Sequence, residues 1–472
     1  MWTLVPEIWL LIVKGLGFAV AVLHLAFVPV VLARRREPSV TFSWLLMLLL
    51  LPAVGVILYW VFGRGEVRRS ARARRALLAA RQRGQQAPDY AALPVAWRPL
   101  ARTAWESGRA ALSLGNRVSI LQNAEQTYPA KLEAIRGAQR TIDLAYYVFR
   151  SDDTGRTFRE ALVEAASRGV AVRVLLDAFG TPTFGSFWVP LRRVGGRVTR
   201  FLPFNPLAGW SLNLRNHRKI LVVDGQVGFT GGLNIGDEYF GTRRLGAWRD
   251  THVRLEGPAV AQLAGVFADD WAFATGELPG PLPAASPFRD GTAVQILPSG
   301  PDDRAEAIYR VTFAAISLAQ ASLDLTTPYY IPDRALAEAL ITSALRGVRV
   351  RLLLPSRNNQ PLTALASRSY WEELLNAGVA IHLYRPGMIH AKCIVVDGQW
   401  GSVGTANLDI RSFRLNFEVN ALLYGVPEVE ALAAAFEADL LQAVPVQAEA
   451  FQRRSLWAKA GEGGARLLSP IL

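Results

Sequence analysis

The amino-acid sequence predicts an α/β protein made of two copies of one strand–helix unit, preceded by an N-terminal hydrophobic helical hairpin. Three observations carry this prediction. A motif at residues 216–225 (NHRKILVVDG) returns 173 residues later at 389–398 (IHAKCIVVDG). Strand and helix patterns alternate around both copies, which is typical of parallel sheets covered by helices. Two long apolar stretches lie within the first 63 residues.

The two apolar stretches predict membrane helices. Gly15–Ala33 has His24 as its only strongly polar member, and Phe42–Gly63 contains no charged residue. Each is long enough to cross a hydrocarbon layer of roughly 30 Å as a helix. A cleavable signal peptide is not expected, because no basic region precedes the first stretch and a second stretch follows it. We assign residues 1–63 to a membrane hairpin, spanning or re-entrant, with His24 packed inside it.

A basic segment follows the second stretch and supplies seven of the chain's 13 net positive charges. Residues 64–83 contain one glutamate, Glu66, and eight arginines: Arg64, Arg68, Arg69, Arg72, Arg74, Arg75, Arg81 and Arg83. The positive-inside rule then places the C-terminal bulk on the cytoplasmic side of the membrane. The segment is either a solvated basic helix or, as we favour, a helix lying on anionic membrane lipids. No arginine–aromatic stacking array stands out elsewhere, so nucleic acid is not an expected partner.

The rest of the chain divides by composition and by repetition. We expect a helical connector at 64–115, a first half at 116–275, a proline-rich linker at 276–291, and a second half with a C-terminal tail at 292–472. Segments 138–144 and 168–176 return at 319–325 and 346–354. A strand at Thr141–Phe149, a helix at Thr157–Ser167 and a strand at Val170–Leu176 predict a parallel pair joined by a right-handed crossover.

Each copy of the motif reads His-x-Lys-x4-Asp-Gly, and an asparagine follows its histidine by 17 residues. The apolar run after the lysine predicts a buried strand, on which His217 and Lys219 share one face, as do His390 and Lys392. Lysine supplies positive charge and histidine changes protonation near neutral pH, so each pair suits a phosphate. If the halves pack about a pseudo-twofold axis, both pairs face one site.

Two histidines at one phosphodiester predict a displacement in two steps. One neutral imidazole attacks phosphorus and forms a phosphohistidine, while the other protonates the leaving alcohol and then activates the incoming one. The lysines, with Asn234 and Asn407, are expected to neutralise and orient the phosphate oxygens. No metal or other cofactor is expected, because the site lacks the ligand cluster that a metal needs.

Four carboxylates complete the candidate site. Asp224 and Asp397 end the two motifs and count among the catalytic residues, although their place beyond the apolar run favours a bond to backbone or to a neighbouring side chain. Asp250 follows the first motif and Glu418 follows the second, at comparable distances. We assign Asp250 and Glu418 as the acceptors that orient His217 and His390. The remaining candidates are ordinary residues: His252 and His382 on strands, and Cys393 as a small buried side chain.

The chain resembles the phospholipase D superfamily, whose signature is the doubled HxKxxxxD, and within it the bacterial cardiolipin synthases. The resemblance is carried by segments 215–219 (RNHRK), 230–239 (TGGLNIGDEY), 248–252 (WRDTH), 327–333 (TPYYIPD), 390–392 (HAK), 404–412 (GTANLDIRS) and 416–420 (NFEVN). Superfamily members often carry serine two residues before the motif's asparagine. Gly232 and Thr405 stand there in this chain, and of the two only Thr405 keeps a hydroxyl that could bind substrate.

The resemblance implies two α/β/α sandwich halves that meet at one active site. It also implies reversible transfer of a phosphatidyl group between two phosphatidylglycerol molecules, giving cardiolipin and glycerol. His217 is then the nucleophile and His390 the acid and base. Phosphatidylethanolamine or another alcohol is an open alternative for the second substrate. The alternative activity is a phospholipase D-type hydrolase of membrane lipids. A non-enzymatic lipid-binding protein is disfavoured, because it would carry a degraded histidine or lysine.

Overall fold

The computed structural model describes residues 14, 15, 17, 18, 22, 26–33, 38–51, 54–56, 58–59, 88–182, 185–203, 214–241, 245–282, 284–301 and 306–469. The chain separates into two compact units. One comprises residues 1–66 and 204–213, and the other comprises residues 67–203 and 214–472. The second unit carries both histidine motifs.

In the first unit, α2 spans Pro38–Leu50. A small core joins the two apolar stretches, with the Tyr59 ring edge-on to Phe27 at 6.2 Å and to Trp44 at 5.1 Å. Among the residues that the structure describes, no helix is both long and apolar enough to cross a bilayer. The membrane hairpin is therefore not confirmed. His24 and the basic segment 64–83 lie outside the described residues.

The second unit contains two similar halves, preceded by η1 (Val95–Trp97) and α5 (Arg98–Gly108). The elements of the first half are β1 (Ser113–Gln122), α6 (Asn123–Gly137), β2 (Thr141–Tyr146), α7 (Asp153–Ser167), β3 (Ala171–Asp177), η2 (Ser186–Trp188), α8 (Val189–Arg193), β4 (Arg197–Phe201), β5 (Arg215–Asn216), β6 (Ile220–Val223), β7 (Val227–Gly231), η4 (Asp237–Phe240), β8 (Thr251–Glu256) and α9 (Ala259–Thr275).

The second half repeats this order and adds a tail. Its elements are β9 (Thr292–Ser299), α10 (Ala307–Leu318), β10 (Ser322–Thr326), β11 (Tyr330–Ile331), α11 (Arg334–Leu345), β12 (Arg349–Pro355), α12 (Pro361–Arg368), α13 (Trp371–Asn376), β13 (Ala380–Tyr384), β14 (Cys393–Val396), β15 (Trp400–Gly404), β16 (Leu408–Asp409), α14 (Ile410–Arg414), β17 (Asn416–Leu423), α15 (Val426–Leu440), β18 (Ala443–Pro445), α16 (Ala448–Gln452) and α17 (Leu456–Arg466).

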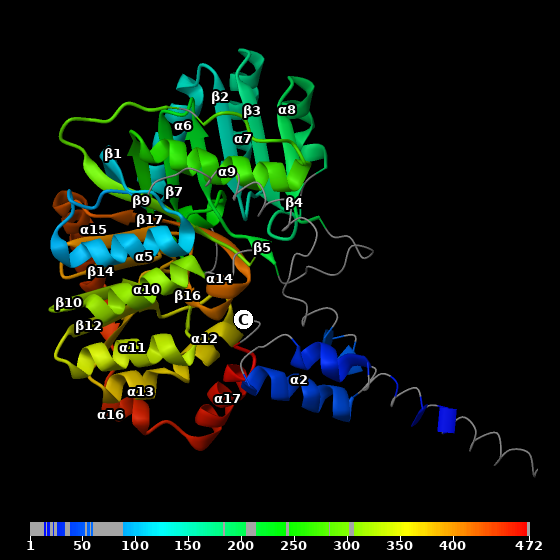
Figure 1. Cartoon of the computed structure of the whole chain (residues 1–472), viewed down its shortest axis with the longest axis vertical. Helices are drawn as coiled ribbons and strands as arrows, with labels where there is room; N and C mark the ends of the chain where they lie inside the picture. Colours follow the sequence, from blue (N-terminus) through cyan, green and yellow to red (C-terminus); the bar gives the residue numbers. More distant parts are fainter. Residues whose placement is uncertain are drawn as a thin grey trace, which may run out of the picture. The chain divides into compact units, whose positions relative to one another are not determined.

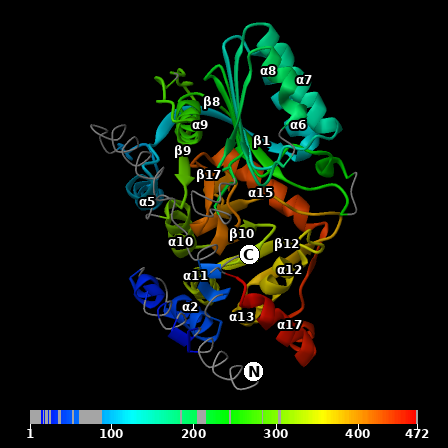
Figure 2. The ribbon, with the colours of Figure 1, turned by 90° about the vertical axis from the view of Figure 1, so that its right-hand side faces the viewer.

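One sheet runs through both halves in the order β18-β13-β12-β10-β14-β15-β17-β9-β1-β8-β7-β6-β2-β3-β4 (Figure 1). The neighbours β9 and β1 lie in the middle of this order. Outward from them, each strand of the second half, apart from β18, has its equivalent at the same position in the first half. In Figure 2, α9 lies on one face of the first-half strands, and α6, α7 and α8 lie on the other. The duplicated α/β/α halves are thus confirmed, and they meet at the centre of the sheet.

The repeated helices begin and end at matching residues. The Asp152 carboxylate accepts from the Gly155 N–H at the start of α7, and Asp333 accepts in the same way at the start of α11. Such caps satisfy amide groups that have no partner within the helix. Gly169 and Gly347 follow the two helices with φ of 91°, a conformation that glycine adopts without steric cost. The local sequence therefore fixes the length of both crossover helices.

The expected parallel pair is confirmed, with β2 and β3 in register from Thr141–Ala171 to Tyr146–Leu176. The first strand ends three residues earlier than predicted, and the helix begins four residues earlier. No helix or strand occurs among the described residues between α9 and β9, where the linker was expected.

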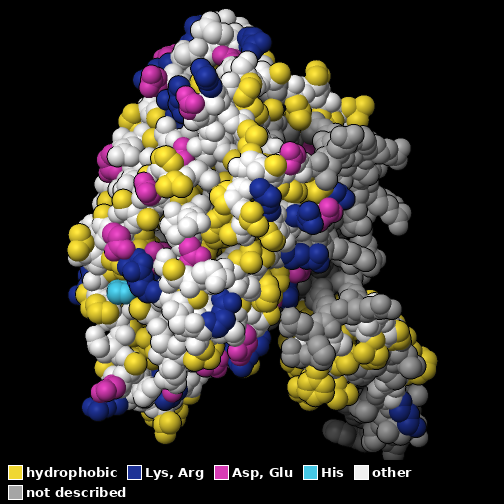
Figure 3. Space-filling model, turned by 60° about the vertical axis from the view of Figure 1, so that its left-hand side comes forward, with side chains coloured by type: hydrophobic (Ala, Val, Ile, Leu, Met, Phe, Trp, Pro, Cys, Tyr) yellow, Lys and Arg dark blue, Asp and Glu magenta, His cyan; other side chains and the backbone are white. Residues whose placement is uncertain are grey.

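On the face that Figure 3 presents, cationic and acidic side chains are interspersed.

Candidate active site

The first histidine motif begins beside a strand of the other half. β5 runs parallel to the start of β17, and the His217 N–H donates to the Phe417 carbonyl at 2.9 Å. This pairing brings the His217 ring to Glu418, the next residue on β17. The two carboxylate oxygens of Glu418 lie 2.9 and 3.0 Å from Nδ1 of His217, and both side chains are buried. A carboxylate from the second half therefore completes the first motif.

The second motif has the same arrangement with the halves reversed. The His390 N–H donates to the Arg249 carbonyl at 2.7 Å, and Arg249 forms a parallel bridge with Ile389. Nδ1 of His390 then lies 2.7 Å from Oδ2 of Asp250, which is the residue after Arg249. Both side chains are buried. A carboxylate from the first half completes the second motif.

The carboxylate partners are therefore exchanged relative to their order in the chain. The sequence suggests that Asp250 orients His217 and that Glu418 orients His390, because each follows that motif. The structure instead pairs His217 with Glu418 and His390 with Asp250. The reason lies in the tertiary structure, because each motif lies beside the residues at which a strand of the opposite half begins. Neither half by itself holds a complete histidine–carboxylate pair.

These hydrogen bonds define which ring nitrogen can react. In both histidines a carboxylate accepts from Nδ1, which leaves Nε2 as the basic nitrogen. The two motifs also lie in one electrostatic environment. Burial lowers the pKa of His217 to about 4, and the ammonium of Lys392 in the other motif adds to this lowering. The pKa of His390 is lowered by burial and by the charges of Lys392, Lys219 and His217.

Both motif lysines are buried and donate to the carbonyl of their own histidine. Nζ of Lys219 lies 2.6 Å from the His217 carbonyl oxygen, and Lys392 donates likewise to His390. Burial lowers the pKa of Lys219 to about 7 and that of Lys392 to about 8, and Lys392 contributes to the lowering at Lys219. Two ammonium groups held together out of water form a strong site for an anion, because an anion relieves both desolvation and repulsion.

This arrangement predicts a decline of kcat/KM as the pH rises from 7 to 9. A lysine is neutral above its pKa, so the free enzyme loses its phosphate-binding charge in this window. The decline in kcat should come at higher pH, because the bound phosphate stabilises both ammonium groups. The measurement is a pH profile of both constants. Lys219→Arg should move the kcat/KM decline upward, since a guanidinium stays charged. A kcat/KM that stays constant from pH 6 to 9 would contradict this account.

The two asparagines lie three residues beyond the strands β7 and β15 that follow the motifs, and both are buried. Asn234 accepts from the Val148 N–H at 3.2 Å, and its Nδ2 lies 3.3 Å from the Tyr239 hydroxyl. Nδ2 of Asn407 donates to Asp409 at 3.0 Å, while its Oδ1 has no hydrogen-bond partner among the described residues. The asparagines are held by their own halves, and their contact with substrate stays a prediction.

The Thr405 side chain contacts Glu418, the carboxylate that binds His217. Its hydroxyl donates to Glu418 Oε2 at 2.5 Å and accepts from the Val419 N–H at 2.9 Å. The hydroxyl therefore positions Glu418, and its expected contact with substrate stays a prediction. At the equivalent place in the first half, a side chain on Gly232 would overlap the Asp250 carboxylate.

The aspartates that end the motifs bind backbone N–H groups. Asp224 accepts from the backbone N–H groups of residues 139, 140 and 141 at 2.7–2.8 Å, and Asp397 accepts from residues 320, 321 and 322 at 2.7–2.9 Å. Both have positive φ, of 54° and 53°. The expected bond to backbone is confirmed, and these bonds favour a structural role for both aspartates over the catalytic one. Each aspartate binds the turn before the neighbouring strand, at the end of the motif strand away from the histidine.

Two groups of residues around the histidines did not follow from the sequence patterns. Aromatic rings surround the imidazoles: Tyr147 lies 5.0 Å from His217, and Trp248 lies 5.1 Å from His390. Tyr239 and Tyr329 also pack near His390, at 6.3 and 6.5 Å. Trp248 stands two residues before Asp250, and that proximity was the available signal. These rings exclude water and so favour the neutral imidazoles.

The second group is a pair of buried guanidinium clamps. Arg218 donates to the backbone carbonyl of Glu418 at 3.0 Å and pairs with Asp270 at 2.5 Å. Arg249 donates to the carbonyl of Asp250 at 2.5 Å and pairs with Asp439 at 2.8 Å. Each catalytic carboxylate thus has its backbone held by an arginine whose charge an aspartate neutralises. Such support positions a site more rigidly than the hydrogen bond to histidine alone.

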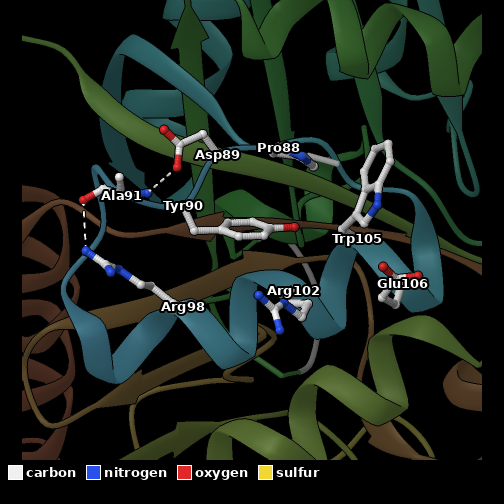
Figure 4. A pocket seen from close by; sticks show the side chains of 8 residues that line it. All are labelled: Pro88, Asp89, Tyr90, Ala91, Arg98, Arg102, Trp105 and Glu106. Carbon is white, nitrogen blue, oxygen red and sulfur yellow. Dashed lines mark hydrogen bonds between the residues drawn. The ribbon is translucent and has the colours of Figure 1, made fainter. Parts of the chain in front are cut away.

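A separate surface pocket of about 550 Å³ lies beside α5 (Figure 4). Its lining consists of Pro88, Asp89, Tyr90, Ala91, Arg98, Arg102, Trp105 and Glu106. Arg98 donates to the carbonyls of Leu93 and Ala91 at 3.0 Å, so it holds the preceding segment on the helix. None of the lining residues belongs to either histidine motif, and the pocket is distinct from the active site.

Family models match both the catalytic halves and the N-terminus. A model described as cardiolipin synthase, phospholipase D-like domain matches residues 132–271 and 313–440. A model described as phospholipase D-nuclease N-terminal matches residues 19–64. The fold is also similar to the crystal structure of a phosphatidylserine synthase from Haemophilus influenzae Rd KW20. That likeness has a TM-score of 0.59 at 14% identity and covers 79% of this chain and 100% of the other.

Curated relatives match over nearly the whole chain. The chain is 39% identical over 465 residues to a cardiolipin synthase of Geobacillus sp. strain WCH70, covering 96% of this chain and 92% of the relative. It is 35% identical over 496 residues to cardiolipin synthase 1 of Bacillus anthracis, covering 100% of this chain and 94% of the relative. The chain therefore belongs to the bacterial cardiolipin synthase family of the phospholipase D superfamily and is a phosphatidyltransferase.

Proposed function

We propose that this enzyme transfers a phosphatidyl group from one phosphatidylglycerol to the free glycerol hydroxyl of another, giving cardiolipin and glycerol reversibly. The observation that carries the proposal is the crossed pairing of two histidines with two carboxylates around two buried lysines. A single anionic phosphodiester fits this set, because one imidazole can attack while the other manages the proton.

In the first step, Nε2 of His217 attacks phosphorus and the bond to the leaving glycerol oxygen breaks. His390 enters this step protonated on both ring nitrogens and gives its Nε2 proton to that oxygen, so free glycerol departs and a phosphatidyl–histidine remains. In the second step, His390 removes the proton from the glycerol hydroxyl of a second phosphatidylglycerol. That oxygen attacks the phosphohistidine, cardiolipin forms, and His217 is released. Lys219, Lys392 and the two asparagines stabilise the negative charge on the remaining phosphate oxygens.

The two carboxylates differ in a way that supports these roles. Burial raises the pKa of Glu418, but His217, Lys219 and Thr405 outweigh it and hold the pKa below its usual value. An ionised Glu418 keeps the proton on Nδ1 and makes Nε2 of His217 nucleophilic. Burial raises the pKa of Asp250 to about 7 despite the opposing charge of Lys392. The Asp250–His390 pair, which already holds one proton at Nδ1, therefore exchanges a second proton near neutral pH, and that proton on Nε2 suits a proton shuttle.

We infer that the enzyme works at the bacterial cell membrane, with its catalytic domain on the cytoplasmic side. The N-terminal family match at residues 19–64 and the arginines of residues 64–83 support this location. Phosphatidylglycerol and cardiolipin are the proposed lipid partners, and the same arginines favour anionic lipids around them.

Product analysis on phosphatidylglycerol vesicles tests the proposed reaction. Mass spectrometry should find cardiolipin and glycerol in equal amounts, because each transfer releases one glycerol. Added glycerol should drive cardiolipin back to phosphatidylglycerol, since the same intermediate serves both directions. Phosphatidic acid without cardiolipin would establish hydrolysis instead. Cardiolipin that forms only after phosphatidylethanolamine is added would identify phosphatidylethanolamine as the second substrate. The two-step mechanism would stay the same.

A further inference from the structure

The C-terminal helix α17 has its charged side toward the protein and its apolar side toward solvent. Leu456 is 83% exposed, Trp457 is 88% exposed, and Leu467, just beyond the helix, is 82% exposed. On the opposite side, Ala465 and the carboxylate-bearing Glu462 are buried. Helices on the surface of soluble domains show the reverse pattern, with the apolar face inward. The exposed face of α17 therefore needs an apolar partner.

The orientation of α17 is fixed by buried ion pairs. Glu462 accepts from Arg368 of α12 at 2.9 Å and from Arg454 at 2.7 Å. Arg454 also binds Glu372 at 2.7 Å, and the Ser455 side chain caps the start of the helix. A buried carboxylate between two arginines is costly to separate. The helix therefore cannot turn its apolar face inward without breaking these pairs.

The same surface continues toward the active site through α12. This helix packs against α17 and exposes Leu362 and Leu365. The segment just before α12 binds an active-site ring, since Asn359 accepts from the Tyr329 hydroxyl at 2.7 Å. The Tyr329 ring in turn lies 6.5 Å from His390. Figure 2 shows α12 and α17 side by side on this part of the second half. The apolar face thus adjoins the elements that line the site.

The charge around this face is positive. The tail from Phe451 to Leu472 contains four cationic side chains, Arg453, Arg454, Lys459 and Arg466, and one carboxylate, Glu462. Arg454 pairs with Glu462 and Glu372, and Lys459 also lies 3.4 Å from Glu372. The positive charge beside the apolar face therefore comes mainly from Arg453 and Arg466. Exposed tryptophan and leucine next to lysine and arginine match the interface of an anionic bilayer, where the rings enter the headgroup layer and the cations bind phosphates.

We propose that α17, with the exposed leucines of α12, docks on an anionic phospholipid bilayer and holds the active site at its surface. The inference rests on the proposed function in one respect: an enzyme with a lipid substrate works where a bilayer can meet this face. Binding of α17 itself needs no turnover, so the two can fail separately. Docking would supply lipid to the site without full extraction of a second phosphatidylglycerol from the membrane.

A fluorescent label at position 457 tests the docking directly. The background is the full-length His217→Ala variant, which is expected to bind lipid without turnover. The test protein carries Trp457→Cys in addition. The matched control carries Leu441→Cys, at a position outside α17 that is 89% exposed. The native Cys393 is only partly exposed and burial raises its pKa to about 12, so it should be labelled far more slowly than an exposed cysteine. Each protein is labelled with a nitrobenzoxadiazole dye and reconstituted in phosphatidylglycerol vesicles that contain spin-labelled lipid.

Quenching of at least half of the emission at position 457, with little at 441, is the expected result. Equal, water-like emission at both positions would overturn the proposal. Shielding of position 457 in detergent that grows with protein concentration, without quenching in vesicles, would also overturn it and identify a second copy as the partner. Vesicles of neutral phosphatidylcholine should reduce the quenching several-fold, because the cations lose their partner.

Turnover gives an independent readout in the chain with intact histidines. Trp457→Ser with Leu467→Ser should lower cardiolipin formation on vesicles at least fivefold. The same variant should act normally on short-chain phosphatidylglycerol dispersed as monomers, and Leu441→Ser should change neither rate. Equal losses on both substrates would indicate damage to the fold instead and would reject the docking role.

Discussion

Replacing His217 with alanine is expected to lower cardiolipin formation by about 10⁴-fold or more, since the covalent step loses its nucleophile. Removing His390 should be comparably severe on phosphatidylglycerol, because the leaving glycerol oxygen then receives no proton. The two variants should differ on a phosphatidyl ester of p-nitrophenol, whose leaving group needs no proton. His390→Ala should release one burst of nitrophenol per site and retain a phosphatidyl–histidine, whereas His217→Ala should release none.

The controls separate chemistry from folding. His217→Ala leaves Glu418 buried without its imidazole partner, so a lower melting temperature is expected and folding must be verified by circular dichroism. His382→Ala, at a half-buried position on β13 away from the motifs, should keep full activity. A burst from His217→Ala and none from His390→Ala would reverse the assigned roles. Full activity in either variant would remove that residue from the mechanism.

The second large effect is expected from the two carboxylates, and its pattern tests the crossed pairing. Glu418→Gln should slow the first step by about 10²–10⁴-fold, since an amide cannot hold the proton of His217 on Nδ1. Asp250→Asn should act through His390 instead. It should therefore suppress turnover of phosphatidylglycerol while preserving most of the nitrophenol burst. Single-turnover measurements on both esters distinguish the two effects.

The uncrossed pairing makes the opposite prediction. If Asp250 oriented His217, Asp250→Asn would abolish the burst and Glu418→Gln would preserve it. Glu418→Asp keeps the charge with a shorter side chain, and it should recover part of the lost rate in the crossed arrangement. An equal loss of burst in all three variants would show that the carboxylates only support the fold.

Several features followed from local sequence because they depend on local physics. The repeated motif predicted two buried strands, which begin directly after the lysines as β6 and β14, and the repeated strand–helix–strand pattern predicted parallel pairing, as β2 and β3 show. Helix ends followed from aspartate caps and glycine stops, as at α7 and α11. The bond of Asp224 to backbone followed from its place beyond the apolar run.

Other features depended on how the halves meet. Asp250 and Glu418 exchange partners because each motif pairs with the start of a strand in the opposite half. The spacing of residues along the chain does not reveal that contact. The use of Thr405 on Glu418, and the clamps formed by Arg218 and Arg249, likewise join segments far apart in the chain. Their donors and acceptors find one another only after the sheet has formed.

By itself, the sequence determined the chemistry of this protein: two histidines, two lysines and two carboxylates in a duplicated α/β unit. The tertiary structure alone decided which carboxylate serves which histidine, and that the tail presents an apolar face to solvent. The physical reason is that side-chain identity and strand periodicity are local properties. Hydrogen bonds between halves and the exposure of a helix face arise only from packing.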